Sequence, residues 1–99
     1  MTNWRIYIVK AQIFNLREWV NETDGQKLYC KYKQLLELAG FNIVGEVEHW
    51  FTPQGYTCLF LLSESHFAVH TFPEEGKTYI ELSSCNKKYF DNFKKLSKL

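Results

Sequence analysis

The side chains best suited to chemistry are concentrated between Ser63 and Glu74, where the chain reads S-E-S-H-F-A-V-H-T-F-P-E. Its histidines could transfer protons, because an imidazole titrates close to neutral pH. Cys85 follows further along the chain, and a thiol can also donate a proton when its surroundings tune its pKa. Taken alone, however, His70 would be a strand histidine satisfied by a hydrogen bond, and Cys85 would be a small buried hydrophobe. The surrounding pattern must therefore decide whether these groups are reactive.

A zinc site is one alternative for these residues. His66 and His70 fall on the same face of a strand, and Cys85 could join them as a third ligand. No Cys-x-x-Cys pair or other standard ligand spacing accompanies them, so no metal site is predicted. Cys30 and Cys58 are interpreted as small structural hydrophobes.

The order of residues in this segment resembles the self-cleavage segment of bacterial S-adenosylmethionine decarboxylases. The family pattern is Ser-Glu-Ser-His, then a hydrophobic, a small and a hydrophobic residue, then His-Thr-aromatic-Pro-Glu. This chain matches the pattern from Ser63 to Glu74. The flanks are similar as well, with Phe51 before a Pro-x-Gly turn and Cys85 at the end of a later strand. The resemblance extends over almost the whole chain.

The resemblance implies a pyruvoyl-dependent decarboxylase made as a proenzyme that cuts itself between Glu64 and Ser65. The Ser65 hydroxyl would attack the Glu64 carbonyl, and the serine would end as a pyruvoyl group. Such a ketone can form a Schiff base with a substrate amine and take up electrons as carbon dioxide leaves, which a decarboxylase without pyridoxal phosphate requires. The implied reaction converts S-adenosylmethionine into the aminopropyl donor for spermidine synthesis.

The resemblance also implies roles for individual residues. His70 would assist the self-cleavage, and Cys85 would return a proton to the substrate carbon. Phe51 would stack on the adenine, and Glu74 would bind the ribose hydroxyls. Thr57 stands where the family often has a serine whose hydroxyl helps processing, and it is grouped with the substrate-binding residues.

Two other functions stay open. Some relatives apply the same pyruvoyl chemistry to ornithine or arginine, and a homologue that does not cleave itself could bind a nucleoside or regulate a partner protein. Trp50 is bulkier and less polar than the family pattern leads us to expect. Bacterial relatives usually continue beyond the last helix into one more strand and a tail, so an altered sheet edge or dimer is expected here.

The elements that must position these residues follow from the spacing of apolar side chains. A helix is expected over residues 23–39, with Leu28, Tyr32, Leu35 and Ala39 on one stripe, Thr23 or Asp24 as its cap and Gly40 at its end. Asn86 can cap a final helix. Strands are expected at residues 4–14, 41–51, 56–62, 67–72 and 77–84, with a short turn from Asn15 to Trp19. This order predicts an α+β fold, an antiparallel sheet with helices on one face.

The strand at residues 56–62 predicts a partner for this sheet, because it is apolar on both of its alternating faces. Two helices can cover only one face, so a second protomer is expected to pack sheet to sheet as an αββα sandwich. The resemblance implies that this homodimer shares its active sites. One protomer would supply Phe51, Thr57, His70 and Glu74, and the other Ser65 and Cys85.

Composition supports one compact domain over residues 1–99. The chain is 45% hydrophobic and 17% aromatic, which excludes a disordered segment. A net charge of +1 gives no reason to expect a nucleic-acid partner. No apolar run approaches membrane-spanning length, and the first residues lack an apolar signal core. A small-molecule substrate in the cytoplasm is therefore expected.

Overall fold

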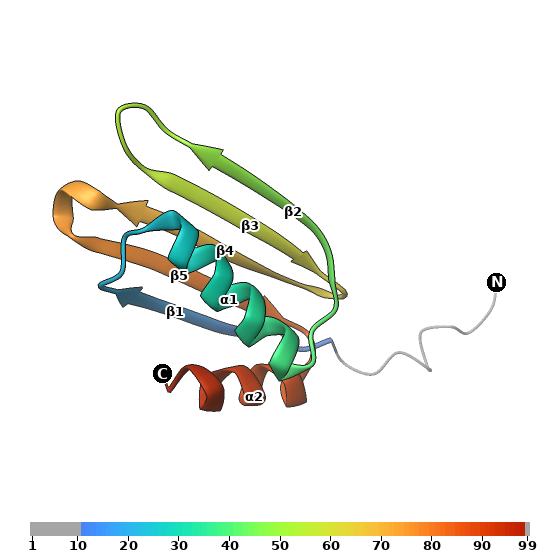
Figure 1. Ribbon diagram of the computed structural model, residues 1–99. Coiled ribbons are helices and arrows are strands. Elements are labelled where there is room, and N and C mark those ends of the chain that lie inside the picture. Colours follow the sequence, from blue (N-terminus) through green and yellow to red (C-terminus); the bar gives the residue numbers. More distant parts are fainter. Residues whose placement is uncertain (1–10, 99) are drawn as a thin grey trace.

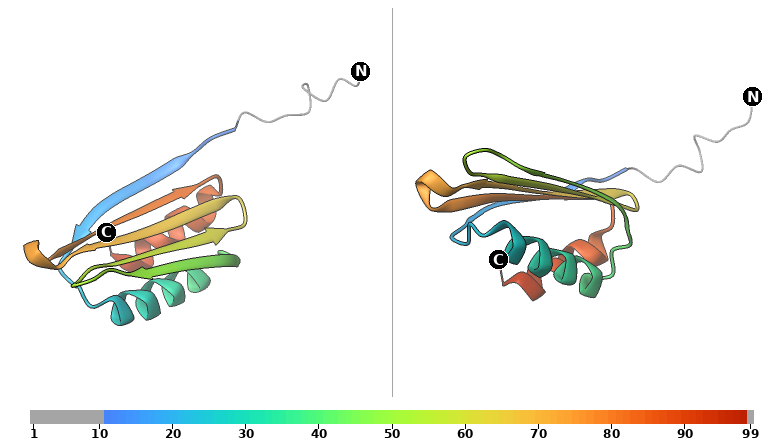
Figure 2. Two further views of the ribbon diagram at one scale, coloured as in Figure 1. Left: turned by 90° about the horizontal axis from the view of Figure 1, so that it is seen from above. Right: turned by 45° about the horizontal axis from the view of Figure 1, so that its top comes forward.

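The computed structural model describes residues 11–98, which form a five-stranded antiparallel sheet and two helices (Figure 1). The elements in chain order are β1 (Phe14–Val20), α1 (Gly25–Ala39), β2 (Ile43–Trp50), β3 (Tyr56–Leu62), β4 (Ser65–Phe72), the 3₁₀ turn η2 (Pro73–Glu75), β5 (Lys77–Ser84) and α2 (Lys87–Ser97). The strands lie in the order β1-β5-β4-β3-β2. Both helices cover the same face of the sheet (Figure 2). The predicted α+β fold is confirmed.

Helix α1 begins and ends where the sequence signals predict. The Asp24 carboxylate accepts hydrogen bonds from the backbone N–H groups of Gln26 (2.9 Å) and Lys27 (3.2 Å), so Asp24 is the cap. Gly40 ends the helix at φ 114°, and a Cβ there would lie 2.7 Å from the Tyr89 ring. Both the left-handed backbone and the close approach therefore require glycine. The buried stripe differs slightly from the expected one, since Leu36 rather than Leu35 is fully buried.

The hydrophobic core lies between the sheet and the two helices. Helix α2 is capped by Asn86, whose side-chain oxygen accepts from Tyr89 N–H at 2.9 Å, and it turns Phe93 inward. The Tyr32 ring of α1 lies 5.1 Å from the Phe67 ring of β4, centroid to centroid. The strand positions that face the helices are fully buried: Cys58, Phe60, Phe67, Val69, Ile80 and Leu82.

The first strand differs from the prediction. Residues 4–10 of the predicted strand lie outside the described residues, and the regular strand begins only at Phe14. The predicted turn from Asn15 to Trp19 is wrong, because this segment is β1 and pairs antiparallel with β5. Side chains in β1 alternate between the two faces of the sheet, so Phe14 and Leu16 are partly buried against the core and Asn15 is exposed.

The face of the sheet opposite the helices carries exposed apolar side chains on β2 and β3, toward the β2 edge. Val47, Leu59 and Leu61 project from β2 and β3 with 65%, 44% and 57% of their surface exposed. Among residues 11–98, no element lies over this face (Figure 2). Strand β3 is thus apolar on both sides, as predicted, and only one side is covered. Neither helix in this part of the chain is long and apolar enough to cross a membrane.

Candidate active site

The predicted cleavage point lies on the tight turn that joins β3 to β4. Ser63 and Glu64 are the two residues between these strands. Glu64 has φ 65°, a left-handed conformation that a residue with a side chain rarely adopts. Such a backbone costs on the order of 1–3 kcal/mol and is frequent at functional sites. The strain falls on the residue whose carbonyl forms the predicted scissile peptide bond.

The end of β5 contacts both sides of that peptide bond. The Glu64 carbonyl accepts a hydrogen bond from Cys85 N–H at 3.4 Å. The Ser65 hydroxyl donates to the Ser84 hydroxyl oxygen at 2.9 Å, and the two serines are register partners in the sheet. Ser65 and Ser84 are both buried. The carbonyl and the hydroxyl that self-cleavage would join are therefore held by Ser84, the last residue of β5, and by Cys85, which follows it.

Ser84 was not identified by sequence reasoning. Its place on the buried face could have been read from the alternation of β5, since Ile80 and Leu82 share that face. Its pairing with Ser65 depends on the register between β4 and β5, which no local pattern in either strand specifies.

Thr57 and His70 are brought together on the face of the sheet without helices. They are register partners in β3 and β4, and Thr57 Oγ1 lies 3.1 Å from His70 Nδ1. The Tyr79 ring of β5 stacks beside the imidazole, with 6.4 Å between centroids and 21° between planes. These contacts hold the ring in place, and when Nδ1–H donates to Thr57 Oγ1, Nε2 is the nitrogen that can accept a proton.

Phe51 and Glu74 lie at the end of the sheet where β2 and β4 finish. Phe51 N–H donates to the Gly55 carbonyl at 2.9 Å, and its half-exposed ring lies 4.4 Å from the His49 ring. Glu74 is exposed in η2. Beside them is a pocket of about 350 Å³, lined by Thr23, Asp24, Gly25, Trp50, Phe51, Pro53, Gln54, Gly55, Tyr56, Thr71 and Pro73.

Trp50 is accommodated on the helix-facing side of β2. Its ring lies 4.3 Å from the Tyr56 ring, centroid to centroid. A Cβ on Gly25 would lie 2.8 Å from the Trp50 ring and 2.6 Å from the Tyr56 ring. Glycine at the start of α1 therefore makes room for the large side chain, which forms one wall of the pocket beside Phe51.

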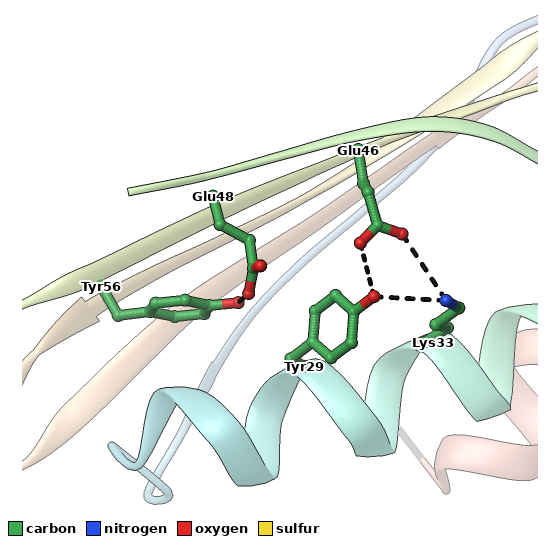
Figure 3. A network of polar contacts seen from close by, with 5 residues as sticks. All are labelled: Tyr29, Lys33, Glu46, Glu48 and Tyr56. Carbon is green, nitrogen blue, oxygen red and sulfur yellow. Dashed lines mark hydrogen bonds and ion pairs between the residues drawn. The ribbon is translucent and has the colours of Figure 1, made fainter. Parts of the chain in front are cut away.

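A polar network fastens β2 to its neighbours (Figure 3). Tyr29 and Lys33 of α1 reach Glu46, with 3.2 Å between Lys33 Nζ and Tyr29 Oη, and the Tyr56 hydroxyl donates to Glu48. Burial, followed by the bond to Glu48, raises the pKa of Tyr56 above its ordinary value. The network was not predicted, because it joins residues far apart in sequence. It steadies the edge strand that carries Phe51 at its end.

The cysteines differ in their surroundings. Cys58 is buried, and that burial raises the pKa of its thiol to about 11, which suits the structural role expected of it. Cys30 is exposed on α1, so the expectation of a buried hydrophobe is wrong there. Cys85 is exposed at the end of β5, beside the Glu64 carbonyl. Within residues 11–98, no three His, Cys, Asp or Glu side chains lie close enough together to hold a metal ion.

The predicted site residues form two groups at opposite ends of the sheet (Figure 1). Glu64, Ser65 and Cys85 lie at the end with the β3–β4 turn, and the other group lies toward the end with η2. Ser65 and His70 lie five positions apart in β4, which is roughly 16 Å of extended strand. An odd separation also puts them on opposite faces. One chain therefore does not bring the two groups together.

Three comparisons relate this chain to known proteins. Residues 16–96 match the family model of S-adenosylmethionine decarboxylase. The S-adenosylmethionine decarboxylase proenzyme of Symbiobacterium thermophilum is 48% identical over 47 residues, covering 48% of this chain and 36% of that protein. The proenzyme of Brevibacillus brevis is 38% identical over 64 residues, covering 65% of this chain and 48% of that protein. The chain thus spans less than half the length of these curated relatives.

A solved structure is similar in fold. The crystal structure of the adenosylmethionine decarboxylase from Aquifex aeolicus superposes with a TM-score of 0.68 and 18% sequence identity. The superposition covers 88% of this chain and 81% of that one. The likeness is therefore one of fold over most of the chain.

Proposed function

Because the chain belongs to the S-adenosylmethionine decarboxylase family, we propose that it is a proenzyme that cleaves itself between Glu64 and Ser65 and then decarboxylates S-adenosylmethionine. The observation that carries this proposal is the local structure of the Glu64–Ser65 bond. A strained Glu64 backbone, a bound carbonyl and an oriented hydroxyl converge on one peptide bond. A two-residue hairpin turn commonly has a positive φ, but it requires neither the bound carbonyl nor the oriented hydroxyl.

The proposed cleavage begins with an N→O acyl shift. The Ser65 oxygen forms a bond to the Glu64 carbonyl carbon, and the peptide C–N bond breaks. The hydroxyl gives up its proton, and the freed amine of residue 65 gains one. The negative charge that develops on the Glu64 oxygen is met by Cys85 N–H, whose hydrogen bond is long in the resting chain and can shorten as charge grows. The product of this step is an ester between the two residues.

The second step of the proposed cleavage is an elimination. A base removes the α-proton of residue 65, the Glu64 carboxylate leaves with the former serine oxygen, and a dehydroalanine remains. Water then replaces the nitrogen, which departs as ammonia, and a pyruvoyl group is left at residue 65. His70 suits the role of base, because Nε2 can accept a proton when Nδ1–H donates to Thr57 Oγ1.

The residues around position 65 fit such a group. Strand β4 is paired on both sides there, with Leu62 of β3 and Ser84 of β5, so a new chain end would stay anchored in the sheet. A pyruvoyl ketone supplies an electron sink for removing carbon dioxide from an amine-bearing substrate. Cys85 is exposed and adjoins this end, so its thiol can return a proton to the substrate carbon. Phe51 and Glu74 would hold the adenine and ribose.

The proposed enzyme is a homodimer whose sites are shared. In support, Ser65 and His70 of one chain are roughly 16 Å apart along β4. The exposed apolar side chains of β2 and β3, at Val47, Leu59 and Leu61, would be buried by a second copy. A two-fold pairing would bring opposite ends of the two sheets into contact. Phe51, Thr57, His70 and Glu74 of one protomer would then meet Ser65 and Cys85 of the other.

Intact-mass measurement on the purified chain tests the proposal directly. We expect two fragments, one ending at Glu64 and one beginning with a pyruvoyl group that borohydride or phenylhydrazine modifies. Release of carbon dioxide from S-adenosylmethionine, compared with ornithine and arginine, then identifies the substrate. A single full-length mass that never changes would overturn the proposal and favour a non-cleaving, nucleoside-binding or regulatory homologue. Three free thiols are compatible with the cytoplasm, the location we propose.

A further inference from the structure

We propose that Ser84 is a positioning residue for self-cleavage, which holds the Ser65 hydroxyl so that its oxygen is available to the Glu64 carbonyl. The inference rests on the proposed self-cleavage and adds a residue to it. Ser84 is 1% exposed and its hydroxyl oxygen lies 2.9 Å from that of Ser65. Because the pair is buried, water does not readily take the place of either partner.

The direction of the hydrogen bond follows from the other partners of Ser84. Its hydroxyl donates to the Asn86 carbonyl at 3.3 Å, and its oxygen accepts from Asn86 N–H at 2.9 Å. A serine hydroxyl has one proton and two acceptor positions. With the proton committed to Asn86, Ser84 can act toward Ser65 only as an acceptor. Ser65 must therefore donate, and its lone pairs are left for attack on the carbonyl carbon.

The position of Ser84 is itself fixed by α2. Asn86, which holds the Ser84 hydroxyl through its backbone, caps this helix by accepting from Tyr89 N–H. The same short segment includes Cys85, whose N–H binds the Glu64 carbonyl. The start of α2 thus orients the hydroxyl through Ser84 and the carbonyl through Cys85. These are the two groups between which the new bond forms.

The role of Ser84 would end once the chain is cut. In the proposed reaction the Ser65 oxygen departs as part of the new Glu64 carboxylate. Residue 65 then carries no hydroxyl for Ser84 to hold. A positioning role therefore predicts slower cleavage with unchanged turnover by chains already cleaved. A general loss of stability would affect both.

The test compares Ser84→Ala, Ser84→Thr and Ser83→Ala with the natural chain. Cleavage is followed by intact mass over time, and carbon dioxide release is expressed per cleaved chain. We expect Ser84→Ala to cleave roughly tenfold more slowly, the effect of one lost hydrogen bond on a positioned group. Ser84→Thr keeps the hydroxyl and should restore most of the rate. Ser83→Ala, which removes a hydroxyl from the opposite face of β5, should cleave normally.

The outcomes separate this inference from the proposed function. If the natural chain cleaves and Ser84→Ala cleaves equally fast, the inference is overturned and the proposed function stands. If Ser84→Ala and Ser84→Thr are equally slow, the hydroxyl is not the cause and the inference is again overturned. If the natural chain stays whole, both fail together. Circular dichroism of each variant establishes that the sheet and helices have formed.

Discussion

The two ends of the sheet hold their predicted site residues in different ways. At the β3–β4 turn, Ser65 is buried and hydrogen-bonded, and the Glu64 carbonyl is bound. At the opposite end, Phe51 and Glu74 are exposed, and Phe51 lines an open pocket of about 350 Å³. The first arrangement suits a reaction within the chain, since the reacting groups need no ligand to align them. The second suits binding of a molecule that arrives later.

The largest effect should come from removing the proposed nucleophile at the first end. Ser65→Ala lacks the oxygen that must attack the Glu64 carbonyl, so we expect no cleavage and no carbon dioxide release. Intact mass after prolonged incubation measures this. Ser63→Ala is the matched control, because Ser63 is an exposed serine in the same turn. Slow but real cleavage of Ser65→Ala would move the proposed cleavage point elsewhere.

Bringing the residues of the two ends into one site should require a second copy of the chain. A charge on the exposed apolar face of the sheet should prevent that dimer from forming. Leu61→Asp introduces a carboxylate at a side chain that is 57% exposed in one chain. We expect monomers by analytical ultracentrifugation, loss of cleavage by at least about tenfold, and little change in folding, since burying an unpaired charge is costly only in the dimer. Leu38→Asp, at a 65% exposed position on α1, should stay dimeric and active. A cleaving Leu61→Asp monomer would contradict the shared site.

Mixing two inactive variants tests whether Ser65 and His70 of one site come from different protomers, because a shared site predicts that cleavage is recovered. A heterodimer of Ser65→Ala and His70→Ala has one site with both changes and one site with neither. With random exchange of equal amounts, roughly half of the His70→Ala chains should sit in such dimers and cleave. The measurement is the mass of the His70→Ala chain before and after mixing. No recovery under conditions where subunits exchange would mean that His70 acts within its own chain.

Local sequence patterns predicted most of the secondary structure but only part of the site at the β3–β4 turn. The apolar spacing located α1, β3, β5 and the cap of α2, because these depend on local periodicity and capping. The turn assigned to residues 15–19 failed, since a single polar residue was given more weight than the period of two in β1. Ser84 and the Glu46–Tyr29 contact were missed, because both depend on how distant strands and helices pair. Local patterns carry no information about register.

The smallest expected effect concerns Cys58, which is buried on the helix-covered side of β3. Burial raises the pKa of Cys58 from its ordinary value of 9.0 to about 11. Above pH 9 the thiol therefore ionises in the unfolded chain while it stays protonated in the folded chain. The stability it contributes is complete below pH 9 and is lost as the pH rises toward 11, with a total loss on the order of 2–3 kcal/mol.

Urea unfolding at several pH values measures this loss. Between pH 8 and 10, before the tyrosines dominate, we expect the free energy of unfolding to fall in the natural chain and to fall less in Cys58→Val, which keeps the volume but does not titrate. Cys30→Val is the control, because Cys30 is exposed and its removal should leave the pH dependence as it was. Equal slopes for the natural chain and Cys58→Val would mean that the thiol is hydrated in the folded state. Water would then reach the helix-covered face of β3 more easily than the burial of Cys58 indicates, and the two faces of β3 would differ less in their exposure to water.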